Sequence, residues 1–216
     1  MSPSLRRWLV SAVPHLRDRE KEPPESDEDE FVEPPLPPHE NYPFQYKKEV
    51  EVRGRKMRFR PIRPDDDDLM IELFSTFSED TIYHRFFTHI KITPERVKRF
   101  THIDYRSEMA LVAVEREDDR RRLLGVSRYA LDSDRDNWAE MAVVVGDPWH
   151  KSGIGTALLK YLFVVARNEG LEGIYGLVHY DNRPIFKIFE RLGHSVKTID
   201  TGTEICYEIL LDRPST

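Results

Sequence analysis

The chain has 216 residues, of which 39% are hydrophobic and 33% are charged, and its formal net charge at pH 7 is −6. This length accommodates one domain of ordinary size with extensions, and the charge balance excludes the strongly basic surface that is typical of nucleic-acid-binding proteins. No apolar run approaches the roughly 20 residues needed to span a bilayer, so we expect neither a nucleic-acid nor a membrane partner.

The first 42 residues differ from the rest of the chain in composition. They carry five basic and ten acidic side chains, and residues 21–40 contain six prolines. With almost no large apolar side chains, this stretch cannot bury enough surface to offset the entropy of ordering. We therefore expect a disordered, acidic, proline-rich tail over residues 1–42, with a docking or autoinhibitory segment as the alternative. One folded domain is expected over residues 43–213.

The folded pattern begins with a hairpin and three helices. Alternation over residues 46–52 and 57–62, on either side of a charged turn, predicts two strands. Asp65–Asp68 then open a helix, where acidic residues suit the macrodipole and cap free N–H groups. Attraction of a lysine substrate is the alternative role for these acids. Ser78 begins a second helix, and Thr93, followed by proline, begins a third.

Strands are more frequent in the rest of the chain. Three strands are expected at 109–114, 123–131 and 138–145, then a helix at 154–168, a strand at 174–180, a helix at 184–192 and a closing hairpin at 196–199 and 204–210. Short connections make the first three of these strands antiparallel neighbours. The sequence therefore predicts a mixed α/β domain.

The junction between the strand that ends at Val145 and the helix that begins at Ile154 contains Gly153 and Gly155. Glycine lets the backbone approach a ligand closely, and a helix N-terminus presents N–H groups to an anion. Neither G-x-x-x-x-G-K-[ST] nor the third glycine of G-x-G-x-x-G is present. We therefore predict a diphosphate cradle outside both standard nucleotide motifs, with plain packing of the glycines as the alternative.

The order His150-x-x-Gly153-x-Gly155, after a strand and before a helix, resembles the acetyl-CoA signature of the GNAT superfamily of N-acetyltransferases. His150 stands where that signature usually has Gln or Arg. The order of the predicted elements also resembles that of the superfamily. The resemblance implies a central, mostly antiparallel mixed sheet flanked by helices. That sheet is splayed between its fourth and fifth strands, where the pantetheine of acetyl-CoA inserts.

A closer resemblance, over about residues 57–193, is to the GNAT domain of bacterial protein lysine acetyltransferases. It is carried by the segments Arg60–Asp66, Tyr83–Phe87, Ile103–Ala110 and Ala139–Val145. This resemblance implies that acetyl-CoA is the co-substrate and that the partner is a protein that presents a lysine.

Glu140 is the candidate general base. Both faces of the strand Trp138–Val145 are largely apolar, so a carboxylate there has no solvated face unless it lines a cleft. Partial burial raises the pKa of a carboxyl group toward the range useful for a base, and a lysine ammonium with a pKa of about 10.4 must lose a proton. The resemblance also implies a base at this position. The alternative is a structural ion pair with Arg128 or Arg85.

The resemblance implies the remaining site residues. A main-chain N–H near Val143 or Val145 polarises the thioester carbonyl, and main-chain donors of the glycine loop hold the diphosphate, with Lys151 either a counter-charge or an exposed loop residue. The cofactor-binding candidates are Val143, Val145, His150, Lys151, Ser152, Gly153, Ile154, Gly155, Thr156 and Asn182. Asn182 matches an asparagine that contacts pantetheine in many GNAT enzymes, and helix capping is its alternative role.

Phe189 lies seven residues beyond Asn182, where many GNAT enzymes have a tyrosine that protonates the leaving thiolate. The thiolate here leaves unprotonated or takes its proton from water or another residue. His84, His89 and His102 lack the spacing of metal ligands, so we expect no metal. A single cysteine, Cys206, excludes an intrachain disulfide and favours a reducing, cytoplasmic location. We interpret it as a small core residue.

We therefore expect an N-acetyltransferase that moves the acetyl group of acetyl-CoA to a primary amine by direct attack in a ternary complex. The expected acceptor is a protein lysine, for example on an acyl-CoA synthetase. Two alternatives stay open at this point. An enzyme acting on a small amine, such as a polyamine or an amino sugar, requires an enclosed acidic pocket. A non-catalytic module that senses acyl-CoA binds CoA without turnover.

Overall fold

The computed structural model of the chain describes residues 41–88, 91–117, 120–192, 196–200, 202 and 204–211. Apart from its last two residues, the predicted tail over residues 1–42 lies outside this part of the chain. Tyr42 already belongs to the folded domain, because its side chain is buried and its hydroxyl donates to Pro61 O at 3.0 Å.

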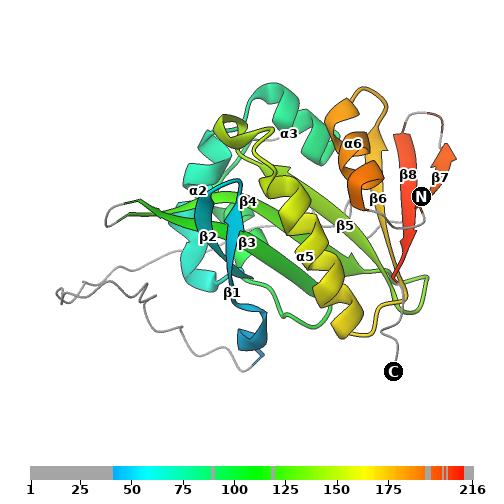
Figure 1. The fold of residues 1–216 in the computed structure, drawn as a ribbon, viewed down its shortest axis with the longest axis horizontal. Coiled ribbons are helices and arrows are strands. Elements are labelled where there is room, and N and C mark those ends of the chain that lie inside the picture. Colours follow the sequence, from blue (N-terminus) through cyan, green and yellow to red (C-terminus); the bar gives the residue numbers. More distant parts are fainter. Residues whose placement is uncertain are drawn as a thin grey trace.

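The described elements form an eight-stranded sheet with helices on both sides (Figure 1). The strands are β1 (Lys48–Val52), β2 (Arg55–Pro61), β3 (Glu108–Glu117), β4 (Arg120–Leu131), β5 (Trp138–Val145), β6 (Gly173–His179), β7 (Val196–Asp200) and β8 (Glu204–Leu210). The α-helices are α2 (Asp67–Ser75), α3 (Glu79–Phe86), α4 (Pro94–Thr101), α5 (Ile154–Asn168) and α6 (Arg183–Leu192). The strand order is β1-β2-β3-β4-β5-β6-β8-β7, and only β5 and β6 are parallel neighbours among these pairs. The expected mixed, mostly antiparallel sheet is therefore confirmed.

Local sequence signals define several helix ends. Ser78 Oγ accepts a hydrogen bond from Thr81 N at 3.2 Å at the start of α3, and Thr93 Oγ1 accepts one from Arg96 N at 3.4 Å at the start of α4. Both are N-cap contacts, as predicted. β3 and β4 are longer than predicted, because the charged residues at their shared end continue the antiparallel ladder.

The sheet is buried on both faces where β3 and β4 cross the domain. Side chains of neighbouring residues point to opposite faces of a strand. On one face, Ser127 Oγ of β4 donates to Leu158 O of α5 at 3.2 Å. On the other, Val126 and Arg128 line a pocket with Phe74 of α2. Figure 1 shows α5 and α6 in front of the sheet and α2 behind it. No described helix is both long and apolar enough to cross a bilayer.

The aspartates that precede α2 make ion pairs as well as a cap. Asp66 accepts from Arg63 N at 2.8 Å, which caps a 3-10 turn at Pro64–Asp66. Its two carboxylate oxygens also bind the two Nη atoms of Arg60 at 2.7 Å each, and both side chains are buried. Asp65 pairs with Arg63, and Asp67 accepts from Thr101. Three of the four acids are thus used inside the domain, which argues against their attracting a lysine substrate.

Candidate functional site

The strands β5 and β6 separate after three residue pairs. The pairs are Trp138↔Gly173, Ala139↔Ile174 and Glu140↔Tyr175. Beyond them β5 continues to Val145 and β6 to His179. We call this divergence, between residues 141–145 and 176–179, the fork. The expected splay lay between the fourth and fifth strands. It is found between the fifth and sixth, because the N-terminal hairpin contributes two strands ahead of the helices.

Two of the candidate residues direct their main-chain groups into the fork. Alternate residues of a strand direct these groups to opposite edges. Trp138 O accepts a hydrogen bond from Asp132 N at 2.8 Å, and Gly146 N donates one to Leu124 O at 3.0 Å. The main-chain groups of the even-numbered residues of β5 therefore point toward β4. Val143 and Val145 are odd-numbered, and their N–H and C=O groups therefore point toward the fork.

His150 contacts this edge through its side chain. Its Nε2 donates to Val145 O at 2.9 Å, and the same nitrogen lies 3.6 Å from Asp147 Oδ1. The imidazole is therefore held against the end of β5. The side chain of His150 is thus engaged with the strand, so the predicted anion site at the following loop would depend on main-chain N–H groups.

The loop over residues 146–153, which we call the cradle loop, turns tightly between β5 and α5. A 3-10 turn at Asp147–Trp149 is followed by left-handed backbone at Lys151, with φ of +60°, and at Gly153, with φ of +93°. Arg53 Nη1 donates to Lys151 O at 2.7 Å and ties the loop to the β1–β2 turn. The Lys151 side chain is exposed.

The start of α5 lies next to the end of β5. Its first helical hydrogen bond runs from Ala157 N to Gly153 O at 3.0 Å, so the N–H groups of Gly155 and Thr156 come before any helical acceptor. A Cβ on Gly155 would lie 3.3 Å from Val145 Cγ2, which puts this glycine in contact with the strand. Ser152 Oγ lies 3.4 Å from Ile154 N. The cradle loop and the fork edge of β5 are therefore contiguous.

Glu140 is the last residue of β5 that pairs with β6, so it stands at the apex of the fork. Its side chain is 7% exposed and shares a strand face with Ala142. Arg85 of α3 interacts with it: burial and the charge of Arg128 lower the pKa of Arg85 to about 10, and Glu140 opposes that shift. The electrostatic contact with Arg85 is thus present, whereas Arg128 forms an ion pair with Glu108 of β3.

A small pocket lies on the same face of the sheet as Glu140. It is lined by Met70, Phe74, Phe77, Arg85, Phe86, Phe100, Val126, Arg128, Ala142 and Val144. The Arg128 guanidinium lies 5.3 Å from the centre of the Phe100 ring. The charged part of this lining is basic, whereas a site for a polyamine needs acidic groups.

Asp147 connects the cradle loop to α3, a contact that sequence reasoning missed. Its carboxylate accepts from Ser78 N at 3.1 Å and from Thr81 Oγ1 at 2.7 Å. The adjoining Gly146 permits this approach, because a Cβ there would lie 2.5 Å from Thr76 Oγ1. The only local signal was an aspartate followed by proline at the start of the loop, and that pattern does not identify a partner about 70 residues away.

Asn182 lies in the short connection between β6 and α6. Its N–H donates to His179 O at 3.0 Å, and its carbonyl accepts from Ile185 N at 3.2 Å, which starts the helix. Its side chain is half-buried.

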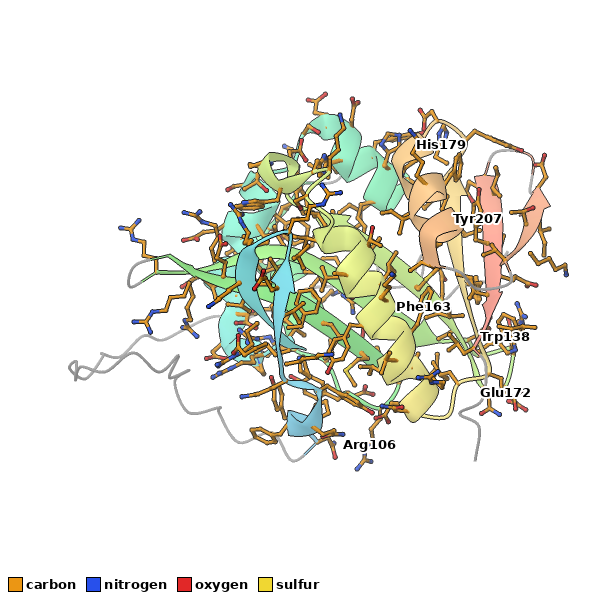
Figure 2. The ribbon with its side chains drawn as sticks, viewed as in Figure 1. Arg106, Trp138, Phe163, Glu172, His179 and Tyr207 are labelled. Atoms are coloured by element: carbon orange, nitrogen blue, oxygen red, sulfur yellow. The ribbon has the colours of Figure 1, made fainter. Side chains whose placement is uncertain are left out.

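Phe189 of α6 is buried and stacks on Tyr207 of β8 with the ring centres 4.7 Å apart. Figure 2 shows Tyr207 beside α6. Next to it, Cys206 is half-buried, and burial raises the pKa of its thiol to about 11. The thiol therefore stays protonated at neutral pH, in line with the interpretation of Cys206 as a packing residue.

Comparisons with known proteins match this chain to acetyltransferases. A family model described as an acetyltransferase (GNAT) domain matches residues 56–195. An acetyltransferase of Pseudomonas aeruginosa is 29% identical over 160 residues, which is 73% of this chain and 86% of that protein. Acetyltransferase Pat of Mycolicibacterium smegmatis is 30% identical over 145 residues, which is 67% of this chain and 43% of Pat. The chain thus matches less than half the length of Pat.

A solved structure shows the same architecture. The GNAT domain of S. lividans PAT superimposes with a TM-score of 0.72 at 26% identity. The superposition covers 79% of this chain and 100% of that domain.

Proposed function

The chain belongs to the GNAT family of acetyltransferases, and from this premise we propose that it transfers the acetyl group of acetyl-CoA to the side-chain amine of a protein lysine, with Glu140 as the general base. The observation that carries the proposal is the fork. One strand edge with outward main-chain groups, a helix N-terminus and a shielded carboxylate converge there within a few residues of sequence.

Acetyl-CoA fits this arrangement in two parts. The amide groups of pantetheine suit an open strand edge, because an extended ligand pairs with main-chain groups as an added strand does. Val143 and the N–H of Val145 supply that edge. The diphosphate suits the N–H groups at the start of α5, where the helix dipole also favours negative charge. Lys151, exposed beside that helix start, supplies a counter-charge. Asn182, at the far side of the fork, is assigned to the pantetheine.

The proposed reaction is direct attack in a ternary complex. Glu140 takes a proton from the lysine ammonium, and the free amine attacks the thioester carbon. The main-chain N–H of Val143 or Val145 donates to the developing oxyanion. The tetrahedral intermediate loses the second amine proton to water and collapses with cleavage of the carbon–sulfur bond, which leaves the neutral amide and CoA thiolate. Because Phe189 has no hydroxyl, the thiolate takes its proton from water.

A protein acceptor is favoured over a small polycation by the charge near Glu140. Arg85 and Arg128 line the pocket beside it, and the described lining contains no carboxylate that could hold the further amines of a polyamine. The resemblance to protein lysine acetyltransferases supports the same acceptor class. The lack of a lining carboxylate bears on polyamines in particular, so amino sugars are tested separately.

The experiment measures CoA release from acetyl-CoA by the wild type and by Glu140→Gln. Acyl-CoA synthetases are offered as protein acceptors, and polyamines and amino sugars as small ones. We expect turnover with protein that falls by roughly 10²–10⁴-fold in the variant, as for loss of a general base, with unchanged acetyl-CoA affinity.

Glu115→Gln is the matched control. Glu115 is a strand carboxylate of β3 that pairs with Arg55 at 3.2 Å, away from the fork. It should retain full activity. Equal activity of Glu140→Gln and the wild type would refute the base assignment. Turnover with small amines alone would refute the acceptor class, and tight binding without turnover would make the domain a sensor.

A further inference from the structure

Two histidines and an aspartate meet beside the fork, outside the residues assigned to acetyl transfer. His84 lies in the last turn of α3, His179 is the last residue of β6, and Asp181 follows two residues later. His84 Nε2 is 2.8 Å and His179 Nδ1 is 2.6 Å from the same oxygen, Asp181 Oδ1. We propose that His84, His179 and Asp181 form a binding site for Zn²⁺.

The fold constructs this cluster from elements that are distant in sequence. His179 lies two residues along β6 from Leu177 and four from Tyr175, which is paired with Glu140, so His179 shares the strand face of Glu140. That face is the one against which α3 packs. The Tyr83 ring meets the His179 ring edge-on, with centres 5.5 Å apart, and fixes the imidazole orientation. Figure 2 shows His179 at the α3 end of β6.

The geometry suits a small divalent ion. The three ligand atoms lie within 4.8 Å of one another. Tetrahedral Zn²⁺ with bonds of about 2.0–2.1 Å separates its ligand atoms by roughly 3.3 Å. The N···O distances of 2.8 and 2.6 Å must therefore lengthen by about 0.5 and 0.7 Å. Asp181 accommodates this shift, because its side chain is 62% exposed and lies in a connection between elements.

The chemistry of the donors also favours zinc. Imidazole nitrogens suit Zn²⁺ better than Mg²⁺ or Ca²⁺, and three protein ligands leave a fourth position for water. His84 also lies at the C-terminal end of α3, where the helix dipole favours a cation. Metal binding replaces the hydrogen atoms that the imidazoles now share with Asp181.

The expectation of no metal considered only the spacing of histidines along the chain. His84 and Asp181 are 97 positions apart, so no local motif marks the site. Bound zinc would join α3, which carries Arg85, to the connection that carries Asn182. The proposal concerns binding and does not depend on acetyl transfer.

The test uses the full chain without a histidine tag, titrated with Zn²⁺ by calorimetry and followed by thermal unfolding. We expect one ion per chain. At about a hundredfold excess over the dissociation constant, the melting temperature should rise by roughly 5–10 °C, from the linkage relation and the usual dependence for domains of this size. Mg²⁺ at the same concentration should produce no shift.

His84→Gln and Asp181→Asn should each abolish the stoichiometric binding and the thermal shift. His102→Asn is the matched control, because His102 Nδ1 also lies near an aspartate, 3.6 Å from Asp67, without a second histidine. Cys206→Ser tests the single thiol. Absence of a zinc-induced shift in the wild type, or equal shifts in all four variants, would show that the cluster is a hydrogen-bonded His–Asp–His contact and not a metal site.

Discussion

The buried ion pair between Arg60 and Asp66 should be the most sensitive charged contact of the domain. The Asp66 carboxylate accepts three hydrogen bonds, two from Arg60 and one from Arg63 N. Substitution Asp66→Asn keeps the shape, removes the charge and turns an amide donor toward a guanidinium donor. It leaves the Arg60 charge buried without its counter-ion.

The expected loss follows from burial. Both side chains are at most 1% exposed, and removal of one partner from a buried ion pair costs about 3–5 kcal/mol. For a chain of this size, that corresponds to a decrease in melting temperature of roughly 6–20 °C. Glu49→Gln is the control, because Glu49 pairs with Arg58 while its side chain is 67% exposed. An exposed pair contributes about 0–1 kcal/mol.

The assay is urea unfolding followed by circular dichroism, with the slope of the transition compared between variants. A double variant, Arg60→Met with Asp66→Asn, sharpens the test. It removes the Arg60 guanidinium, which would otherwise be buried without a counter-ion, and keeps an amide oxygen that can accept the hydrogen bond from Arg63 N. The double variant should therefore be more stable than Asp66→Asn alone. The reasoning would be refuted if Asp66→Asn lost less than about 1 kcal/mol, the exposed-pair range, or if the double variant were the less stable of the two.

Three further predictions concern the site. Gly153→Ala should lower the free energy of unfolding by roughly 1–2 kcal/mol, because alanine is strained at φ of +93°, and calorimetry should show weaker binding of acetyl-CoA. Gly155→Ala, at a helical position, should have smaller effects on both quantities. Larger effects for Gly155→Ala than for Gly153→Ala would contradict the role assigned to the left-handed Gly153. Burial alone raises the pKa of Asp147, but hydrogen bonds from Thr81 and Ser78 outweigh it and hold the pKa below 3.8. Its contribution to stability is therefore full above that pH and lost below it, so the stability difference between the wild type and Asp147→Asn should shrink as the pH falls through this range. A stability difference that does not change with pH would exclude a stabilising role for the hydrogen bonds of Asp147 with Ser78 and Thr81. Native Cys206 should resist iodoacetamide at pH 8 and react after unfolding, as mass spectrometry would show; fast native labelling would contradict its burial.

Elements whose signals are local in sequence could be predicted. α5 begins at Ile154 and ends at Asn168 as expected, because its apolar spacing and the glycine before it are encoded within one stretch. The Thr93 cap similarly defines the start of α4. Within the candidate site, the left-handed Gly153 and the strand that carries Glu140 follow from such local patterns.

Contacts between distant segments could not be predicted. Nothing around Asp147 identifies Ser78 and Thr81 as its partners, and nothing around Arg85 places it beside Glu140. These contacts depend on how α3 packs against β5, which is a property of the assembled layers. The two-sided apolar pattern around Glu140 does predict burial but does not distinguish a general base from an ion-pair partner. The electrostatic interaction with Arg85 depends on tertiary packing and is not encoded in that pattern.

The short β5–β6 pairing has a consequence for how the domain opens. It divides the sheet into two antiparallel half-sheets, β1–β5 and β6–β8–β7, each of which completes its own ladders. Three residue pairs form the seam between them. Amide protons along this seam should exchange before those of the β3–β4 ladder, because local opening starts where the fewest hydrogen bonds must break. A ligand bound along β5 would stabilise this seam against local opening. Its binding should therefore slow amide hydrogen exchange in both half-sheets.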